Sequence, residues 1–215
     1  MVKHEGREHA IEQALRVRKL VRESAIELNA DLRAVRLAAR AEQRFRIGVE
    51  PDDVDIVVIT HFDFDHAGGN RFFPNADFVV QREQYAYAKA TPQRCFAQDW
   101  GLPGLHYTLL DGDQELLPGI ELLVTPGHAP GHQSVIVRGL PNTGTVILSS
   151  DAAHSHVEFE EERRDPNQDA ETVEKMLASI RRLKRIRDAE GATLLLNHDA
   201  DHWSTGYRLL PEYYD

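Results

Sequence analysis

A group of histidine and aspartate residues directly after a short apolar run constrains this chain more than any other feature. The run spans residues 54–60 and is rich in valine and isoleucine, which favours a buried strand. Four potential metal ligands follow it within six residues, namely His61, Asp63, Asp65 and His66. A loop that leaves a sheet can direct all four side chains to one place, and imidazole together with carboxylate suits zinc, manganese or iron. The alternative is an ordinary polar turn in which Asp65 caps a helix.

The same arrangement recurs at three later positions in the chain. Expected strands at residues 120–125, 143–149 and 192–196 lead to His128, Asp151 and His198. A single histidine or aspartate after a strand is usually a hydrogen-bonded loop residue. Four such placements in one chain favour a common site at the ends of the strands.

The remaining pattern mixes strands with helices. Further strands are expected at residues 76–80, 105–110 and 133–138, and helices at 82–90 and 169–190. This order of elements predicts an α/β or α+β fold. With 215 residues the chain is long enough for one catalytic domain with a sizeable core.

Residues 1–48 differ from the rest and predict a helical arm, because their apolar residues recur at three- and four-residue steps. The arm holds 11 Lys and Arg against 7 Asp and Glu, a charge of +4; the whole chain is −10, so the rest is −14. An acidic body argues against nucleic-acid binding, and a charged helix is usually a solvated face.

Composition also bears on location. No apolar run approaches the 18 residues of a membrane span, and the start lacks the apolar stretch of a secretory signal. Cys95 is the single cysteine, so it cannot form an internal disulfide and is expected to be a bystander. These features predict a cytoplasmic protein without a membrane partner.

Taken together, the motifs resemble the metallo-β-lactamase superfamily and, within it, the N-acyl homoserine lactonase family. The family motif H-x-H-x-D-H matches residues 61–66 with one departure, and T-P-G-H-x-P-G-H-Q-S matches residues 125–134. The bridging aspartate of the family matches Asp151, and its last metal-binding histidine matches His198. The resemblance covers about residues 48–215. It implies an αβ/βα sandwich, shortened at its N-terminus, with a hydrolase domain over residues 49–215.

The resemblance also implies how the ligands divide between two divalent metal ions. His61, Asp63 and His128 would hold the first ion, Asp65, His66 and His198 the second, and Asp151 would bridge them. Two cations lower the pKa of a shared water from 15.7 towards ~7, which gives a bridging hydroxide as nucleophile. Asp65 would then carry a proton during ring opening.

Two departures concern the site itself. Asp63 stands where the family has its second histidine, so zinc is the first expectation and manganese or iron are alternatives, because an added carboxylate favours harder ions. His154 stands where lactonases commonly place a tyrosine; it either donates a hydrogen bond to the oxyanion or lies exposed beside His156. His132 is expected behind the ligands rather than among them. Asp199 and His202 are expected in the outer shell or at the surface.

A third departure leaves the function open. Family members normally begin with several strands that line the substrate cleft, and residues 1–48 contain none, so the arm or a second copy in a homodimer would cover the sheet edge. The leading hypothesis is a lactone hydrolase acting on a small-molecule lactone or ester, plausibly an N-acyl homoserine lactone in quorum quenching. The alternatives are a related hydrolase of thioesters, phosphodiesters or β-lactams, and a metal-stabilised scaffold or binding protein.

Overall fold

The computed structural model describes residues 50–163, 167–205 and 214 of the chain. The helical arm expected over residues 1–48 therefore lies outside the described residues. Among the described helices, none is both long enough and apolar enough to cross a membrane.

The first half of the described chain forms a parallel sheet of three strands. In sheet order these strands are β1 (Ile56–Val58), β2 (Asp77–Gln81) and β3 (His106–Leu110). Three helices belong to this half, namely α3 (Phe64–Ala67), α4 (Arg82–Ala90) and α5 (Ala97–Trp100). Two 3-10 turns, Pro51–Asp53 and Asn70–Phe72, complete it.

The second half forms a mixed sheet of five strands. Their order is β4 (Gln114–Leu117), β5 (Ile120–Val124), β6 (Gln133–Leu140), β7 (Gly144–Leu148) and β8 (Thr193–Leu195). Neighbouring strands are antiparallel, except that β7 and β8 are parallel. The helices of this half are α6 (His156–Glu161), α7 (Ala170–Glu190) and α8 (Ala200–Thr205), and a 3-10 turn covers Ser150–Ala152.

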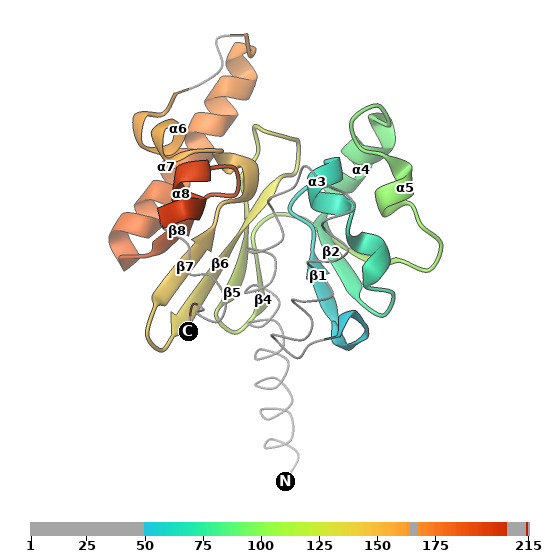
Figure 1. The fold of residues 1–215 in the computed structure, drawn as a ribbon. Coiled ribbons are helices and arrows are strands. Elements are labelled where there is room, and N and C mark those ends of the chain that lie inside the picture. Colours follow the sequence, from blue (N-terminus) through green and yellow to red (C-terminus); the bar gives the residue numbers. More distant parts are fainter. Residues whose placement is uncertain (1–49, 164–166, 206–213, 215) are drawn as a thin grey trace.

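The two sheets face each other, and the helices lie on their outer sides (Figure 1). Val79 of β2 belongs to the same buried cluster as Leu122 of β5 and Val135 of β6, so this cluster fills the space between the sheets. Outside the second sheet, Ile180 and Leu183 of α7 pack in another buried cluster. Each fully buried side chain of this size contributes roughly 1.5–3 kcal/mol through loss of apolar surface to water. The αβ/βα sandwich predicted from the sequence is confirmed.

Gln133 joins the two sheets at the start of β6. Its backbone N–H donates to the Thr60 carbonyl, and its side-chain amide donates to the Ile59 carbonyl at 2.8 Å. Gln81, at the end of β2, donates from Nε2 to the Gln133 carbonyl oxygen Oε1 at 2.9 Å. Buried amides that satisfy each other in this way fix the position of one sheet against the other.

The seven strands predicted from periodicity are present, and so are the two helices predicted within the described residues, with ends that differ by at most two residues. The strand β4 and the short helices α3, α5, α6 and α8 were not predicted. Each of these spans only four to six residues, which is too short for a helical or alternating pattern to repeat.

Candidate metal centre

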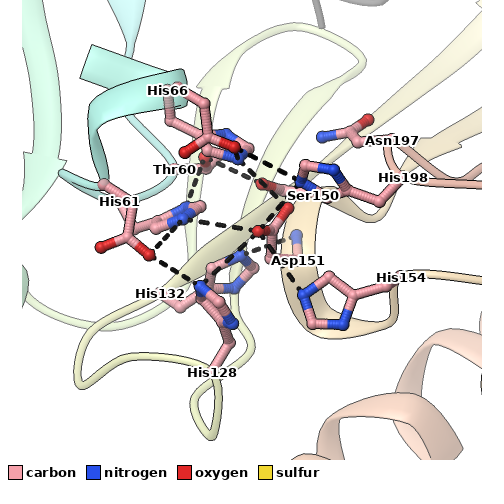
Figure 2. Close-up of polar contacts among 12 residues, drawn as sticks. Thr60, His61, His66, His128, His132, Ser150, Asp151, His154, Asn197 and His198 are labelled. Atoms are coloured by element: carbon pink, nitrogen blue, oxygen red, sulfur yellow. Dashed lines mark hydrogen bonds and ion pairs between the residues drawn. The ribbon is translucent and has the colours of Figure 1, made fainter. Parts of the chain in front are cut away.

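The predicted ligands come from the ends of strands in both sheets. His61 follows β1, Asp63 directly precedes α3, and Asp65 and His66 lie within the single turn of α3. From the second sheet, His128 follows β5, Asp151 follows β7 and His198 follows β8. Figure 2 shows the imidazoles of His61, His66, His128 and His198 directed towards Asp151.

Three groups of ligand atoms in the described residues are compact enough to hold a metal ion each, and two of them lie at this convergence. The ligand atoms of His61, His128 and Asp151 lie within 4.8 Å of one another, and so do those of Asp65, His66 and His198. Asp63 Oδ2 lies 3.5 Å from His61 Nε2 and 3.0 Å from His128 Nε2. We therefore call His61, Asp63 and His128 the first group, and Asp65, His66 and His198 the second group, and treat Asp151 separately.

Asp151 lies between the two groups and contacts both. Its Oδ2 atom is 3.7 Å from His61 Nε2 and 3.6 Å from His128 Nε2 in the first group. In the second group, its Oδ1 atom is 3.3 Å from His66 Nε2 and its Oδ2 atom is 3.3 Å from His198 Nε2. The preceding residue, Ser150, has a left-handed φ of +49°, a strained conformation of a kind that clusters at functional sites.

The residues fit divalent metal ions. Within the described part of the chain, the buried atoms His61 Nε2, His66 Nε2 and Asp151 Oδ1 have no hydrogen-bond partner. A buried polar atom without a partner is costly, and a metal ion would satisfy all three. Burial, together with the neighbouring His66, lowers the pKa of His61 to about 3, so its ring is neutral and its lone pair is free to coordinate. Although burial opposes it, the nearby rings of His154, His198 and His66 hold the pKa of Asp151 below its usual range.

His132 lies behind the ligands, as expected. It is fully buried, and its Nδ1 atom is 2.9 Å from the Thr125 carbonyl oxygen. Its Nε2 atom accepts from the backbone N–H of Asp151 at 3.2 Å. Burial holds the pKa of His132 well below its ordinary value, so the ring is neutral. Both ring nitrogens are engaged, and His132 serves to support the backbone at Asp151.

Asp63 has a partner that the sequence analysis missed. Arg94, in the segment between α4 and α5, donates from Nε to Asp63 Oδ1 and from Nη2 to Asp63 Oδ2, both at 2.7 Å. The same Nη2 atom lies 2.9 Å from His128 Nε2. Against the cost of burial, the neighbouring rings of His128 and His61 and the guanidinium of Arg94 hold the pKa of Asp63 below its usual range. The sequence contains one indirect signal for Arg94: Asp63 adds a carboxylate to the ligands, and an added carboxylate needs a compensating cation.

His154 faces the metal centre rather than His156. Its Nε2 atom is 3.7 Å from Asp151 Oδ2, and its Nδ1 atom is 3.2 Å from Glu158 Oε2. Its ring centroid is 5.3 Å from that of His128. The carboxylate of Asp151 and then that of Glu158 raise the pKa of His154 to about 10. Because Glu158 holds Nδ1, Nε2 faces the site and can donate a hydrogen bond into it.

Asp199 lies next to His198 and has a structural role. Its Oδ2 accepts from the backbone N–H of His156 at 2.6 Å, and its Oδ1 accepts from that of His202 at 3.0 Å. The buried carboxylate thereby holds the beginnings of α6 and α8 beside the site. Asp199 and His202 thus lie outside the two ligand groups, and with His156 they form the third group whose ligand atoms lie within 4.8 Å of one another.

Comparison with known proteins identifies a family and several similar proteins. The family model described as the metallo-beta-lactamase superfamily matches residues 33–203. An N-acyl homoserine lactonase of Bacillus thuringiensis is 38% identical over 168 residues, which is 78% of this chain and 64% of that protein. The N-acyl homoserine lactonase AttM of Rhizobium radiobacter is 37% identical over 180 residues, which is 78% of this chain and 66% of that protein. The chain thus spans slightly less than two thirds of the length of these relatives.

One similar solved structure is that of an N-acyl homoserine lactone hydrolase with the product N-hexanoyl-L-homoserine at its catalytic metal centre. It has a TM-score of 0.70 and 38% sequence identity, and the match covers 79% of this chain and 65% of that one. A putative metallo-beta-lactamase from Thermotoga maritima, with a TM-score of 0.57 and 22% identity, shares the fold.

Proposed function

We propose, from the premise that this chain belongs to the metallo-β-lactamase superfamily, that it is a metal-dependent hydrolase that opens a lactone ring. N-acyl homoserine lactones are the first candidate substrates, because relatives at 37–38% identity are named for that reaction. The observation that carries the proposal is the convergence of seven histidine and aspartate side chains from both sheets, with buried ligand atoms that lack hydrogen-bond partners.

We assign one divalent ion to the first group and one to the second group, with Asp151 between them. Zinc is the first candidate, and manganese or iron are alternatives because of the carboxylate of Asp63. When bound, such ions supply a water of lowered pKa as nucleophile and polarise the carbonyl that is attacked.

Two side chains have proposed roles in the reaction. His154 is held by Glu158 through Nδ1, which leaves its Nε2 proton to stabilise the charge that develops on the carbonyl oxygen. Asp65 belongs to the second group and is only a quarter exposed, with Oδ2 at 3.6 Å from His198 Nε2. Its carboxylate is placed to accept a proton and return it to the leaving alkoxide.

The test is ring opening of short- and long-chain N-acyl homoserine lactones, followed by acid release in weak buffer. We expect turnover that a chelator abolishes and that Zn²⁺ or Mn²⁺ restores. Asp151→Asn should lose this activity, whereas Asp111→Asn, which changes an exposed carboxylate paired with Arg82, should keep it. Folded, metal-loaded protein that opens no lactone contradicts the proposal, and parallel assays with thioesters and phosphodiesters would then identify a related hydrolase.

Replacement of His154 by phenylalanine tests its role separately. The loss of one hydrogen-bond donor to an oxyanion typically lowers kcat by about 100-fold or more. We expect that loss with little change in the metal content. An unchanged kcat would remove His154 from the reaction.

A further inference from the structure

The two ligand groups differ in their contact with an arginine side chain. In the first group, Arg94 holds both oxygens of Asp63 at 2.7 Å and places Nη2 at 2.9 Å from His128 Nε2. In the second group, the ion pairs recorded for Asp65 in the described residues involve only His66 and His198. In the described residues, the carboxylate of the first group thus pairs with an arginine, whereas that of the second group pairs only with histidines.

The guanidinium of Arg94 competes with a metal ion for the same electron pairs. Its nitrogens are donors only, so Nη2 can donate to His128 only in the tautomer that leaves Nε2 unprotonated, and Nε2 then offers Arg94 its lone pair while it lies 3.0 Å from Asp63 Oδ2. That lone pair is the one that a coordinating imidazole offers to a metal. Asp63 is similarly occupied, because each of its oxygens already accepts a charge-assisted hydrogen bond in a bidentate pair.

Arg94 also reduces the negative charge that the carboxylates give the site. The carboxylates of Asp63, Asp65 and Asp151 contribute −3, and the guanidinium brings the sum for these four side chains to −2. This equals the sum that two carboxylates would give with a neutral histidine at position 63. Arg94 is held firmly in this role, because it also lies 3.4 Å from the Tyr87 hydroxyl and its side chain is only about one third exposed.

We propose that Arg94 is a positioning residue that acts as a built-in cation of the first group, so that the chain binds one metal ion tightly through the second group and Asp151. The second ion, at the first group, then binds more weakly, because it must displace Arg94 from His128. This inference rests on the proposed metal site but not on the identity of the substrate. It also weakens the argument that Asp63 favours harder metal ions, because Arg94 already neutralises the added carboxylate in the metal-free chain.

The experiment is a titration of metal-free protein with Zn²⁺ alone and with Co²⁺ alone, without substrate. Calorimetry gives the affinity of each equivalent, and the visible spectrum of Co²⁺ reports its coordination at each step. We expect two separate binding events in the native chain. In Arg94→Gln the second event should become at least ten-fold tighter, while the first should change by less than about three-fold.

Two further variants serve for comparison with Arg94→Gln. Arg94→Lys retains the charge but not the fork of donors, so the second event should tighten less than in Arg94→Gln. Arg82→Gln removes an exposed arginine that also pairs with a carboxylate, Asp111, and should change neither event. Circular dichroism on each variant confirms that it is folded.

Two ions that bind the native chain with equal affinity would overturn the inference. A second event that is unchanged or weaker in Arg94→Gln would also overturn it, since Arg94 would then not compete with the metal. Because these measurements contain no lactone, they are independent of the ring-opening assay. Failure of that assay would contradict the proposed function and leave the metal-binding result in place.

Discussion

At the scale of single residues, Gly127 occupies a position that no larger residue tolerates. Its φ is +134°, and a Cβ atom there would lie 2.3 Å from Met176 Cγ and 2.6 Å from the Met176 backbone nitrogen in α7. The backbone of a buried helix cannot move easily, so Gly127→Ala must displace the loop that carries His128. We expect Gly127→Ala to lower the free energy of unfolding by at least about 2 kcal/mol, measured by urea denaturation.

Gly144 provides the matched control for this substitution. Its φ is also positive, at +78°, but a Cβ atom there would meet no heavy atom within 4 Å. Gly144→Ala should therefore cost only the strain of a left-handed backbone, about 1 kcal/mol. Equal losses in the two variants would mean that the contact with α7 does not determine the cost at Gly127.

The residues that converge at the candidate metal centre could be predicted from the sequence, whereas Arg94 could not. Each ligand follows an apolar run that forms a strand, so the position of the strand places the side chain. Arg94 lies in an irregular segment, 31 residues from Asp63, and no local pattern connects the two. Its position depends on how α4 and α5 pack on the first sheet, which is a property of the folded chain.

At the scale of elements, Arg138 ties two strands of the second sheet to α7. From β6 it donates to Glu121 of β5 at 2.6 Å and to Glu190, the last residue of α7, at 2.8 Å. Thr145 of β7 also donates to Glu190, at 3.0 Å. Arg138 is the main cause that lowers the pKa of Glu190 below its ordinary value of 4.5.

This network predicts a pH-dependent contribution of Glu190 to stability. A lowered folded-state pKa means that the contribution is present above pH 4.5 and is lost as the pH falls through the folded-state pKa. Glu190→Gln should therefore destabilise the protein by no more than about 1 kcal/mol at pH 7, since both partners are partly exposed. The difference from the native chain should close in acid, as measured by urea unfolding across pH.

Glu171→Gln is the control, because Glu171 pairs with Lys175 on an exposed turn of α7. Such exposed pairs contribute little to stability. We therefore expect no measurable change in the free energy of unfolding, either at pH 7 or in acid. If Glu190→Gln and Glu171→Gln behave alike, the link between Arg138 and α7 does not stabilise the sheet.

The success of sequence-based prediction at this scale depends on the length of the element. The 21 residues of α7 give several helical repeats, an N-cap at Asp169 whose Oδ1 accepts from the Thr172 N–H, and a left-handed Gly191 at the end. By contrast, α6 and α8 have six residues each and depend on the carboxylate of Asp199. Tertiary contacts rather than local pattern determine such short helices.

At the scale of the whole molecule, the candidate metal centre joins the two halves of the sandwich. The loop after β1 supplies His61, Asp63, Asp65 and His66, whereas the ends of β5, β7 and β8 supply His128, Asp151 and His198. Apart from the ligands, the halves meet here through a hydrogen bond from Ser150 Oγ to Thr60 Oγ1 at 2.9 Å. Ions that bind these ligands therefore bind only the closed sandwich.

Metal removal should lower the stability of the entire fold. An ion present at a hundred times its Kd, which binds the folded state alone, adds about 2.7 kcal/mol. For a chain of this length each kcal/mol corresponds to roughly 2–4 °C, so chelation should lower Tm by roughly 5–10 °C in a thermal melt. Asp151→Asn should abolish most of this difference, because Asp151 contacts both ligand groups. A Tm that does not respond to chelation in metal-loaded protein would mean that the ions do not hold the two halves together.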